Sequence, residues 1–288
     1  MMKTSTEIAS IAYHVGEEKA IEMCAKAGFD AWDFSMFAMC RYDWETGKAQ
    51  PSTHPLAGSH YAEFAKKLRR IGEDNGIHCN QSHAPFPTTV GPIRDHLKRA
   101  IECTAIAGGS ICVIHPGNDY ELQANVDFYR ELLPFAKEHN VKIATENMWD
   151  WDEEKGHSSF AACATSESFL DHLQTVNDPS FVACLDLGHA EMKGSGSGAV
   201  NMIRALGHHL QALHIHDNDL LNDSHQLPFT MQMDFPAIVN ALKDIGYTGY
   251  FTLEADQYLY GRNADTVFAG VKQMADTARR LADMFEQK

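Results

Sequence analysis

Residues 141–146, VKIATE, place a glutamate directly behind a short run of small and β-branched residues. The same order, an apolar run and then an ionisable residue, recurs in FVACLD (181–186), LQALH (210–214) and YFTLE (250–254). Runs of this length and composition are typical of buried strands. The residues at the four strand ends are Glu146, Asp186, His214 and Glu254. A charged group at the tip of a buried strand is costly without a partner, so we expect these four to meet around a shared divalent cation.

The spacing of the strand ends, 40, 28 and 40 residues, indicates repeated strand–helix units. Candidate strands lie at 8–12, 31–34, 77–81, 110–114, 142–145, 182–185, 212–215 and 250–253. Helical spacing of apolar residues is found at 17–27, 62–71, 93–105, 126–138, 166–175, 199–206, 235–245 and 266–285. Eight such units predict an α/β fold, a single (β/α)8 TIM barrel in which residues 1–288 form one domain. An open doubly wound sheet is the alternative, but it would gather polar residues at one switch point.

Composition and charge limit the classes of function that the chain can have. The chain has 288 residues, 44% of them hydrophobic, and a net charge of −15, which argues against broad binding to nucleic acid. Its seven cysteines form no CxxC pair and are expected to be reduced core residues. We see neither a signal peptide nor an apolar run near the ~18 residues of a membrane span. These features predict a cytoplasmic protein without membrane attachment.

Polar residues follow six consecutive candidate strands, where the active sites of such barrels lie. Besides the four strand ends above, the candidates for a second metal or for substrate contact are His83, His115, His189, Asp223 and His225. Three carboxylates with one imidazole suit Mn²⁺, Mg²⁺ or Co²⁺, whereas the additional histidines favour Zn²⁺. His216 points to the same side as His214 if that strand continues, and is a loop residue if it ends. We favour His214 as the ligand.

Together these segments resemble the xylose isomerase-like barrel superfamily, which includes sugar isomerases, ketose 3-epimerases, inosose-processing enzymes and endonuclease IV. The segments that carry the resemblance are HAPF (83–86), VIHPG (113–117), TEN (145–147), CLDLGHA (184–190), LHIHDND (213–219), DSH (223–225) and TLEA (252–255). They cover nearly the whole chain and are more specific for the superfamily than for one reaction.

The epimerase branch of this resemblance implies one divalent metal held by Glu146, Asp186, His214 and Glu254. It also implies that Glu146 and Glu254 move the proton and that His189 touches substrate. The relatives further imply that the chain can form homo-oligomers.

The endonuclease IV branch implies a different use of the same rim. All positions of its three-zinc cluster are filled here, by His83, His115, Glu146, Asp186, His189, His214, Asp223, His225 and Glu254. Two departures weigh against it. Residues 226–235, QLPFTMQMDF, replace a Gly-rich turn, and the loop after the second strand is long and aromatic, with Phe37, Tyr42 and Trp44.

Three further residues are candidates for substrate contact, namely Trp149, Trp151 and Arg262. Aromatic faces suit the C–H faces of a sugar. Packing of these aromatic residues against one another is an equally supported interpretation. Arg262 would hold a phosphate or carboxylate, or is an ordinary surface arginine.

Our interpretation is an isomerase: a divalent-metal-dependent sugar or sugar-phosphate isomerase or epimerase that transfers a proton through a metal-stabilised enediolate. The alternative is a zinc phosphodiesterase that acts on abasic DNA. A barrel that binds sugars without catalysis is the third reading.

Overall fold

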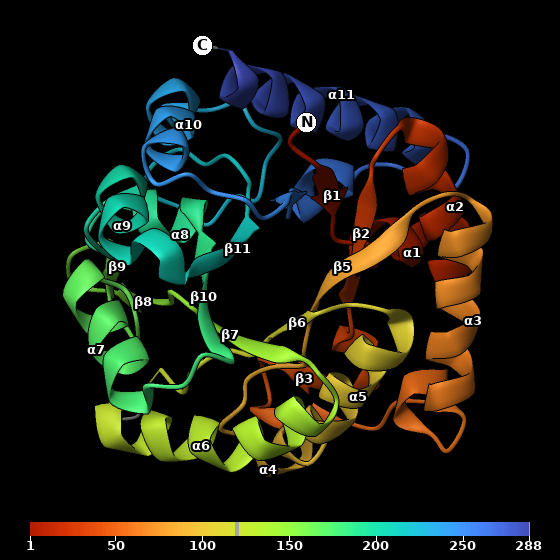
Figure 1. Ribbon diagram of the computed structural model, residues 1–288, viewed down its shortest axis with the longest axis horizontal. Helices are drawn as coiled ribbons and strands as arrows, with labels where there is room; N and C mark the ends of the chain where they lie inside the picture. The colour runs from red at the N-terminus through yellow and green to blue at the C-terminus, as the bar shows by residue number, and fades with distance from the viewer. Residues whose placement is uncertain (119–120, 288) are drawn as a thin grey trace.

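The computed structural model describes residues 1–118 and 121–287. Within them, eight parallel strands surround a central axis, and Figure 1 looks down this axis. The strands are β1 (Thr4–Thr6), β2 (Ala31–Ser35), β5 (His78–His83), β6 (Ile111–Val113), β7 (Lys142–Glu146), β10 (Phe181–Asp186), β11 (Leu210–His214) and β12 (Phe251–Leu253). Six of them form one sheet from β2 to β11, and β1 pairs with β12. Parallel bridges from Glu7 to Asp33 and from Ile215 to Leu253 close the ring, which confirms the predicted barrel.

Helices form the outer layer around this ring (Figure 1). The longer ones are α2 (Glu17–Ala27), α3 (Tyr61–Asp74), α5 (Leu97–Ala107), α6 (Leu122–Glu138), α7 (Ser166–Val176), α9 (Ala199–Leu206), α10 (Phe235–Asp244) and α11 (Val267–Glu286). Short helices are α1 (Ala9–Val15), α4 (Gly91–Arg94), α8 (Leu187–Glu191), η1 (Phe37–Met39), η2 (Pro55–Ala57), η3 (Gly207–His209) and η4 (Asp256–Leu259). No helix in the described part of the chain is long and apolar enough to cross a membrane.

The first predicted strand, residues 8–12, is wrong, because this segment forms most of α1. The strand lies earlier, at Thr4–Thr6, which is polar yet completely buried. Polar residues are tolerated there since the barrel interior supplies partners: the hydroxyl of Ser5 donates to Oδ1 of Asn80 at 2.6 Å. At the start of α1, the N–H of Ser10 donates to the Glu7 carboxylate at 3.1 Å, which satisfies a helix-terminal donor.

Two hairpins that the sequence reading missed lie in the loops after β2 and β7. They are β3–β4 (Arg41–Asp43 with Lys48–Gln50) and β8–β9 (Trp149–Asp152 with His157–Phe160). Both turns read Asp-x-x-x-Gly. Asp43 and Asp152 each accept hydrogen bonds from the backbone N–H groups two and three residues on. Gly47 and Gly156 adopt positive φ angles of 67° and 63°, which favour glycine.

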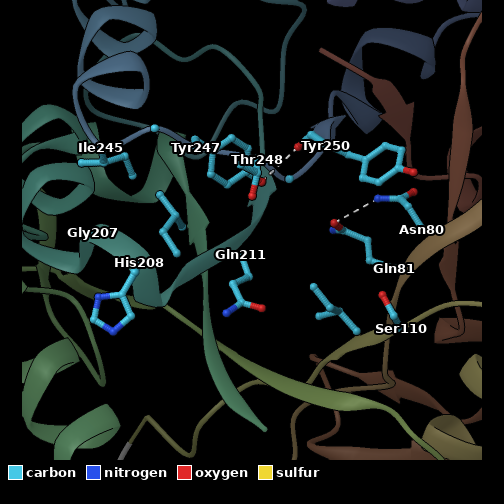
Figure 2. A pocket seen from close by; sticks show the side chains of 14 residues that line it. Asn80, Gln81, Ser110, Gly207, His208, Gln211, Ile245, Tyr247, Thr248 and Tyr250 are labelled. Carbon is cyan, nitrogen blue, oxygen red and sulfur yellow. Dashed lines mark hydrogen bonds between the residues drawn. The ribbon is translucent and has the colours of Figure 1, made fainter. Parts of the chain in front are cut away.

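A polar cavity of about 420 Å³ lies at the amino ends of the strands (Figure 2). Asn80 and Gln81 project into it from β5, and the amide of Asn80 donates to Oε1 of Gln81 at 3.2 Å. Asn80 also contacts the hydroxyl of Thr252 at 3.2 Å. These side chains bond to one another, and the ionisable cluster lies at the opposite end of the barrel.

Candidate functional site

The carboxyl ends of four barrel strands bring one ionisable side chain each to a common point. Glu146, Asp186 and His214 end β7, β10 and β11, and Glu254 follows β12. Ligand atoms of these four residues all lie within 4.8 Å of one another, and each residue is at most 9% exposed. His214 Nδ1 is 2.9 Å from Glu146 Oε1 and 3.3 Å from Glu254 Oε2. We call this group the carboxylate–histidine quartet.

Several atoms of the quartet have no hydrogen-bond partner. Asp186 Oδ2 and His214 Nε2 are buried and unpartnered among the described residues, and Glu146 Oε2 forms no well-directed hydrogen bond although the imidazoles of His83 and His115 lie near it. A buried polar atom without a partner is destabilising, and crowded carboxylates also repel one another. Oxygen and imidazole donors in this arrangement fit a divalent cation, which would use the free lone pairs and offset the negative charge.

The two glutamates of the quartet differ in their electrostatic surroundings. Burial raises the pKa of Glu254, and the nearby Glu146 carboxylate adds to the increase. Burial alone would raise the pKa of Glu146 as well. The nearby His214 and His115 more than offset this effect and hold the pKa of Glu146 well below its ordinary value. The pKa values of the two carboxyl groups are therefore shifted in opposite directions, a difference typical of acid–base pairs.

The second group of donors is formed by His83, His115 and Glu146. The Nε2 atoms of the two histidines are 2.9 Å apart. They lie 3.5 and 3.2 Å, respectively, from Glu146 Oε2. Glu146 thus turns one oxygen to the quartet and the other to the two imidazoles.

The third group consists of His189, His216, Asp223 and His225. Asp223 lies between two imidazoles, with Oδ2 3.3 Å from His189 Nε2 and Oδ1 3.2 Å from His225 Nε2. Burial lowers the pKa of His189, but Asp186 and Asp223 more than compensate and raise it to about 10. The structure thus places all nine predicted rim residues in adjoining groups, and adds His216 to them.

A pocket of about 680 Å³ opens above these groups. The predicted aromatic residues Trp149 and Trp151 line it, together with Phe37, Tyr42 and Trp44. Arg262 does not belong to its lining. The guanidinium of Arg262 donates to Oε1 of Gln273 at 3.0 Å and lies over the ring of Tyr258, so the structure gives no support for its role as an anion-binding residue.

Of three further residues next to the quartet, Asp33 and Asn147 were not predicted as parts of the site, and His216 was considered but His214 was favoured. Asp33 Oδ2 in β2 lies 3.7 Å from His214 Nε2 and accepts a hydrogen bond from Gln81. Asn147 brackets Asp186 by accepting from its N–H at 2.8 Å and donating to its carbonyl at 2.9 Å. His216 is a loop residue, since β11 ends at His214, yet its Nε2 is 3.1 Å from Asp186 Oδ1. A lone acid inside the strand AWDFS was the available signal for Asp33.

Gly188 makes this packing of His216 feasible, and we expect Gly188→Ala to be destabilising. A Cβ atom at Gly188 would lie 2.0 Å from Cε1 of His216. The imidazole has little room to move, because it stacks on His225 with ring centroids 3.9 Å apart. Overpacking of this kind lowers the free energy of unfolding by about 1–3 kcal/mol, which denaturant titration measures. Gly261→Ala is the control, since nothing lies within 4 Å of that Cβ; equal stability of both variants would contradict the close packing.

Comparison with known proteins places the chain among similar barrels. A family model described as a xylose isomerase-like TIM barrel matches residues 21–286. An uncharacterized protein of Methanocaldococcus jannaschii is 27% identical over 257 residues, which are 82% of this chain and 78% of the relative.

Two solved structures illustrate the likeness of fold. A D-tagatose 3-epimerase-like protein superposes with a TM-score of 0.69 at 20% identity, over 98% of each chain. The IOLI protein with a zinc atom bound superposes with a TM-score of 0.71 at 18% identity, over 99% of this chain and 98% of the other. Because the family model spans nearly all of the sequence, the chain belongs to the xylose isomerase-like TIM barrel family.

Proposed function

We propose that this protein is a divalent-metal-dependent sugar isomerase or epimerase. The observation that carries the proposal is the carboxylate–histidine quartet, whose unpartnered donor atoms are buried beneath an aromatic-walled pocket. Glu146, Asp186, His214 and Glu254 would hold the cation, and this donor set suits Mn²⁺, Mg²⁺, Co²⁺ or Zn²⁺. Proteins of the same fold support the proposal, among them a D-allulose 3-epimerase in complex with D-allulose.

A bound cation would supply positive charge that stabilises the negative charge developing on the sugar oxygens as the C–H proton leaves. Glu146 and Glu254 reach the pocket from strands that are separated by β10 and β11. The carboxylate of one can therefore accept the proton from carbon, and the carboxyl of the other can return it from a different direction. Return to the opposite face of the same carbon gives an epimer, and return to the neighbouring carbon gives an isomer.

The surrounding residues hold these groups in position. Asn147 and His216 fix the orientation of Asp186 through the contacts described above. The carbonyl of Asn147 lies 2.9 Å from His189 Nδ1, which leaves Nε2 of this imidazole directed toward Asp223 and the pocket. The indole rings of Trp149 and Trp151 line the wall, where they can cover the C–H face of a sugar and exclude water.

Hydrogen exchange on a ketose tests the proposal. We expect protein loaded with Mn²⁺ to incorporate deuterium from D2O at the carbon beside the carbonyl of D-fructose, D-tagatose or D-allulose. Treatment with a chelator should abolish the exchange, and added Mn²⁺ should restore it, as followed by NMR. Absence of exchange on every ketose by fully loaded, folded protein would contradict the assignment.

A zinc phosphodiesterase acting on abasic DNA is the second candidate. It is favoured by the two additional donor groups, which adjoin the quartet at Glu146 and next to Asp186. The acidic chain, with its net charge of −15, weighs against it, since DNA binding depends on Lys and Arg contacts to phosphates. A nicking assay on an abasic duplex with zinc-loaded protein separates the two candidates, because only the second predicts strand cleavage.

A further inference from the structure

The charge of the pocket lining restricts the substrates that it can take. No described residue that lines the pocket is a lysine or an arginine, whereas five are carboxylates: Glu146, Asp150, Asp223, Glu254 and Asp256. The four lining imidazoles already face carboxylates. His83 and His115 face Glu146, and His189 and His225 face Asp223. A phosphate group would find none of the guanidinium or ammonium partners that phosphates usually have in proteins, and the lining imidazoles are already paired with carboxylates.

The size of the pocket exceeds that of a single sugar ring. A hexose has twelve non-hydrogen atoms, and at the ~30 Å³ that a water molecule occupies in the liquid these would fill roughly 360 Å³. This figure is an upper bound, because bonded atoms pack more closely than water molecules. The pocket measures about 680 Å³, so about half of it remains free after one ring is bound next to the quartet.

An aromatic wall runs from the buried imidazoles to the mouth of the pocket. The ring of Phe86 is centred 4.7 Å from that of His115 and 6.5 Å from that of Trp44. Tyr42 supports Trp44 edge-on at 4.8 Å. The wall therefore continues outward past the space that a first ring next to His115 would occupy. Its last member, Trp44, is 70% exposed although it lines the pocket, which leaves most of the indole free for contact with a ligand.

We propose that the substrate is an uncharged ketose extended by a second sugar ring, with the distal ring held against Trp44. This inference rests on the proposed function and names the substrate class of the same site. The reacting ring binds between Glu146 and Glu254, and the distal ring covers the outer aromatic wall with its C–H face. A sugar phosphate is disfavoured, because the described residues of the lining offer its phosphate no lysine or arginine.

Two readouts test the substrate class separately from the reaction. Binding is measured by calorimetry, with and without Mn²⁺, and deuterium incorporation at the ketose carbon beside the carbonyl is measured by NMR. The probes are lactulose and palatinose as two-ring ketoses, D-fructose as the single ring, and fructose 6-phosphate as the charged analogue. We expect a kcat/KM for exchange at least about tenfold higher, and tighter binding, for a two-ring ketose than for fructose, with fructose 6-phosphate weakest.

The outcomes distinguish the two proposals. Tighter binding of a two-ring ketose without any exchange would overturn the reaction and support the substrate class. Exchange on fructose that equals or exceeds exchange on both two-ring ketoses would support the reaction and overturn the substrate class, as would preference for fructose 6-phosphate. Neither binding nor exchange with any probe would overturn both.

The variant Trp44→Ala tests whether the distal ring binds against Trp44. Loss of one aromatic stacking contact should raise the KM for the preferred two-ring ketose about 3- to 10-fold, and should lower its kcat/KM relative to that of fructose. Phe160→Ala is the control, because Phe160 is equally exposed at 70% and lies on the other hairpin, outside the pocket lining. An unchanged ratio of the two substrates in Trp44→Ala would overturn the placement of the distal ring.

Discussion

Replacing Glu254 with glutamine is expected to lower the rate of hydrogen exchange on a ketose by at least about 100-fold, because a group that moves a proton contributes 10²–10⁴-fold. The Glu254 carboxylate lies 3.3 Å from His214 Nδ1 and lines the pocket, so it is within reach of both the cation and the substrate. The amide keeps one oxygen that can face the cation, but it can neither accept nor return a proton. The measurement is deuterium incorporation under saturating Mn²⁺, with metal affinity determined in parallel by calorimetry.

Glu7→Gln is the control for this variant. Glu7 is also a buried acid beyond a barrel strand, but it does not line the pocket. Burial, followed by the nearby Asp256, raises the pKa of Glu7 to about 8, so near neutral pH the residue is mostly an uncharged acid that glutamine resembles. We expect normal exchange by Glu7→Gln. Unchanged exchange by a metal-saturated Glu254→Gln protein would refute its role in proton transfer.

Loading the metal-free protein with Mn²⁺ or Zn²⁺ is expected to stabilise it markedly. Three carboxylates and an imidazole crowd within 4.8 Å with unpartnered atoms, and a bound cation relieves this repulsion in the folded state alone. At a free metal concentration 100 times the Kd, binding to the folded state adds about 2.7 kcal/mol. For a chain of this size the corresponding rise in Tm is roughly 4–5 °C, measured by thermal unfolding with and without a chelator.

Asp186→Asn tests whether the quartet is responsible for this shift. The variant should lose most of the metal-induced rise in Tm, because it removes one charge of the donor set. Asp178→Asn is the control, since Asp178 pairs with Lys137 at the protein surface and should leave the metal-induced rise intact. A rise in Asp186→Asn equal to that of the unmodified protein would show that the metal binds elsewhere.

The barrel and the quartet were predictable because both depend on local patterns. An apolar run of four or five residues must be buried, and a helix between successive runs forces the strands to be parallel. The carboxyl ends of parallel strands lie on the same rim, so Glu146, Asp186, His214 and Glu254 are brought together by their positions behind those runs. The structure places their ligand atoms within 4.8 Å of one another.

The first strand was misplaced because the prediction relied on apolar runs, which is the signal that located the other strands. Apolar content favoured residues 8–12, although the strand is the polar segment Thr4–Thr6. Its burial depends on partners distant in sequence, such as Asn80, which accepts from the Ser5 hydroxyl. A local pattern carries no information about such a partner, because the contact exists only after the barrel closes.

The amino-acid sequence was sufficient for the barrel, apart from its first strand and the two hairpins, and for the residues that meet at its rim, since hydrophobic periodicity acts between neighbours along the chain. Only the folded arrangement placed Asp33 and His216 at the site and Arg262 beside Gln273. It also left the described residues of the pocket lining without lysine or arginine. These features depend on distances between segments many residues apart. Closure of the ring, the two hairpins and the close approach of His216 to Gly188 set those distances, and no local propensity encodes them.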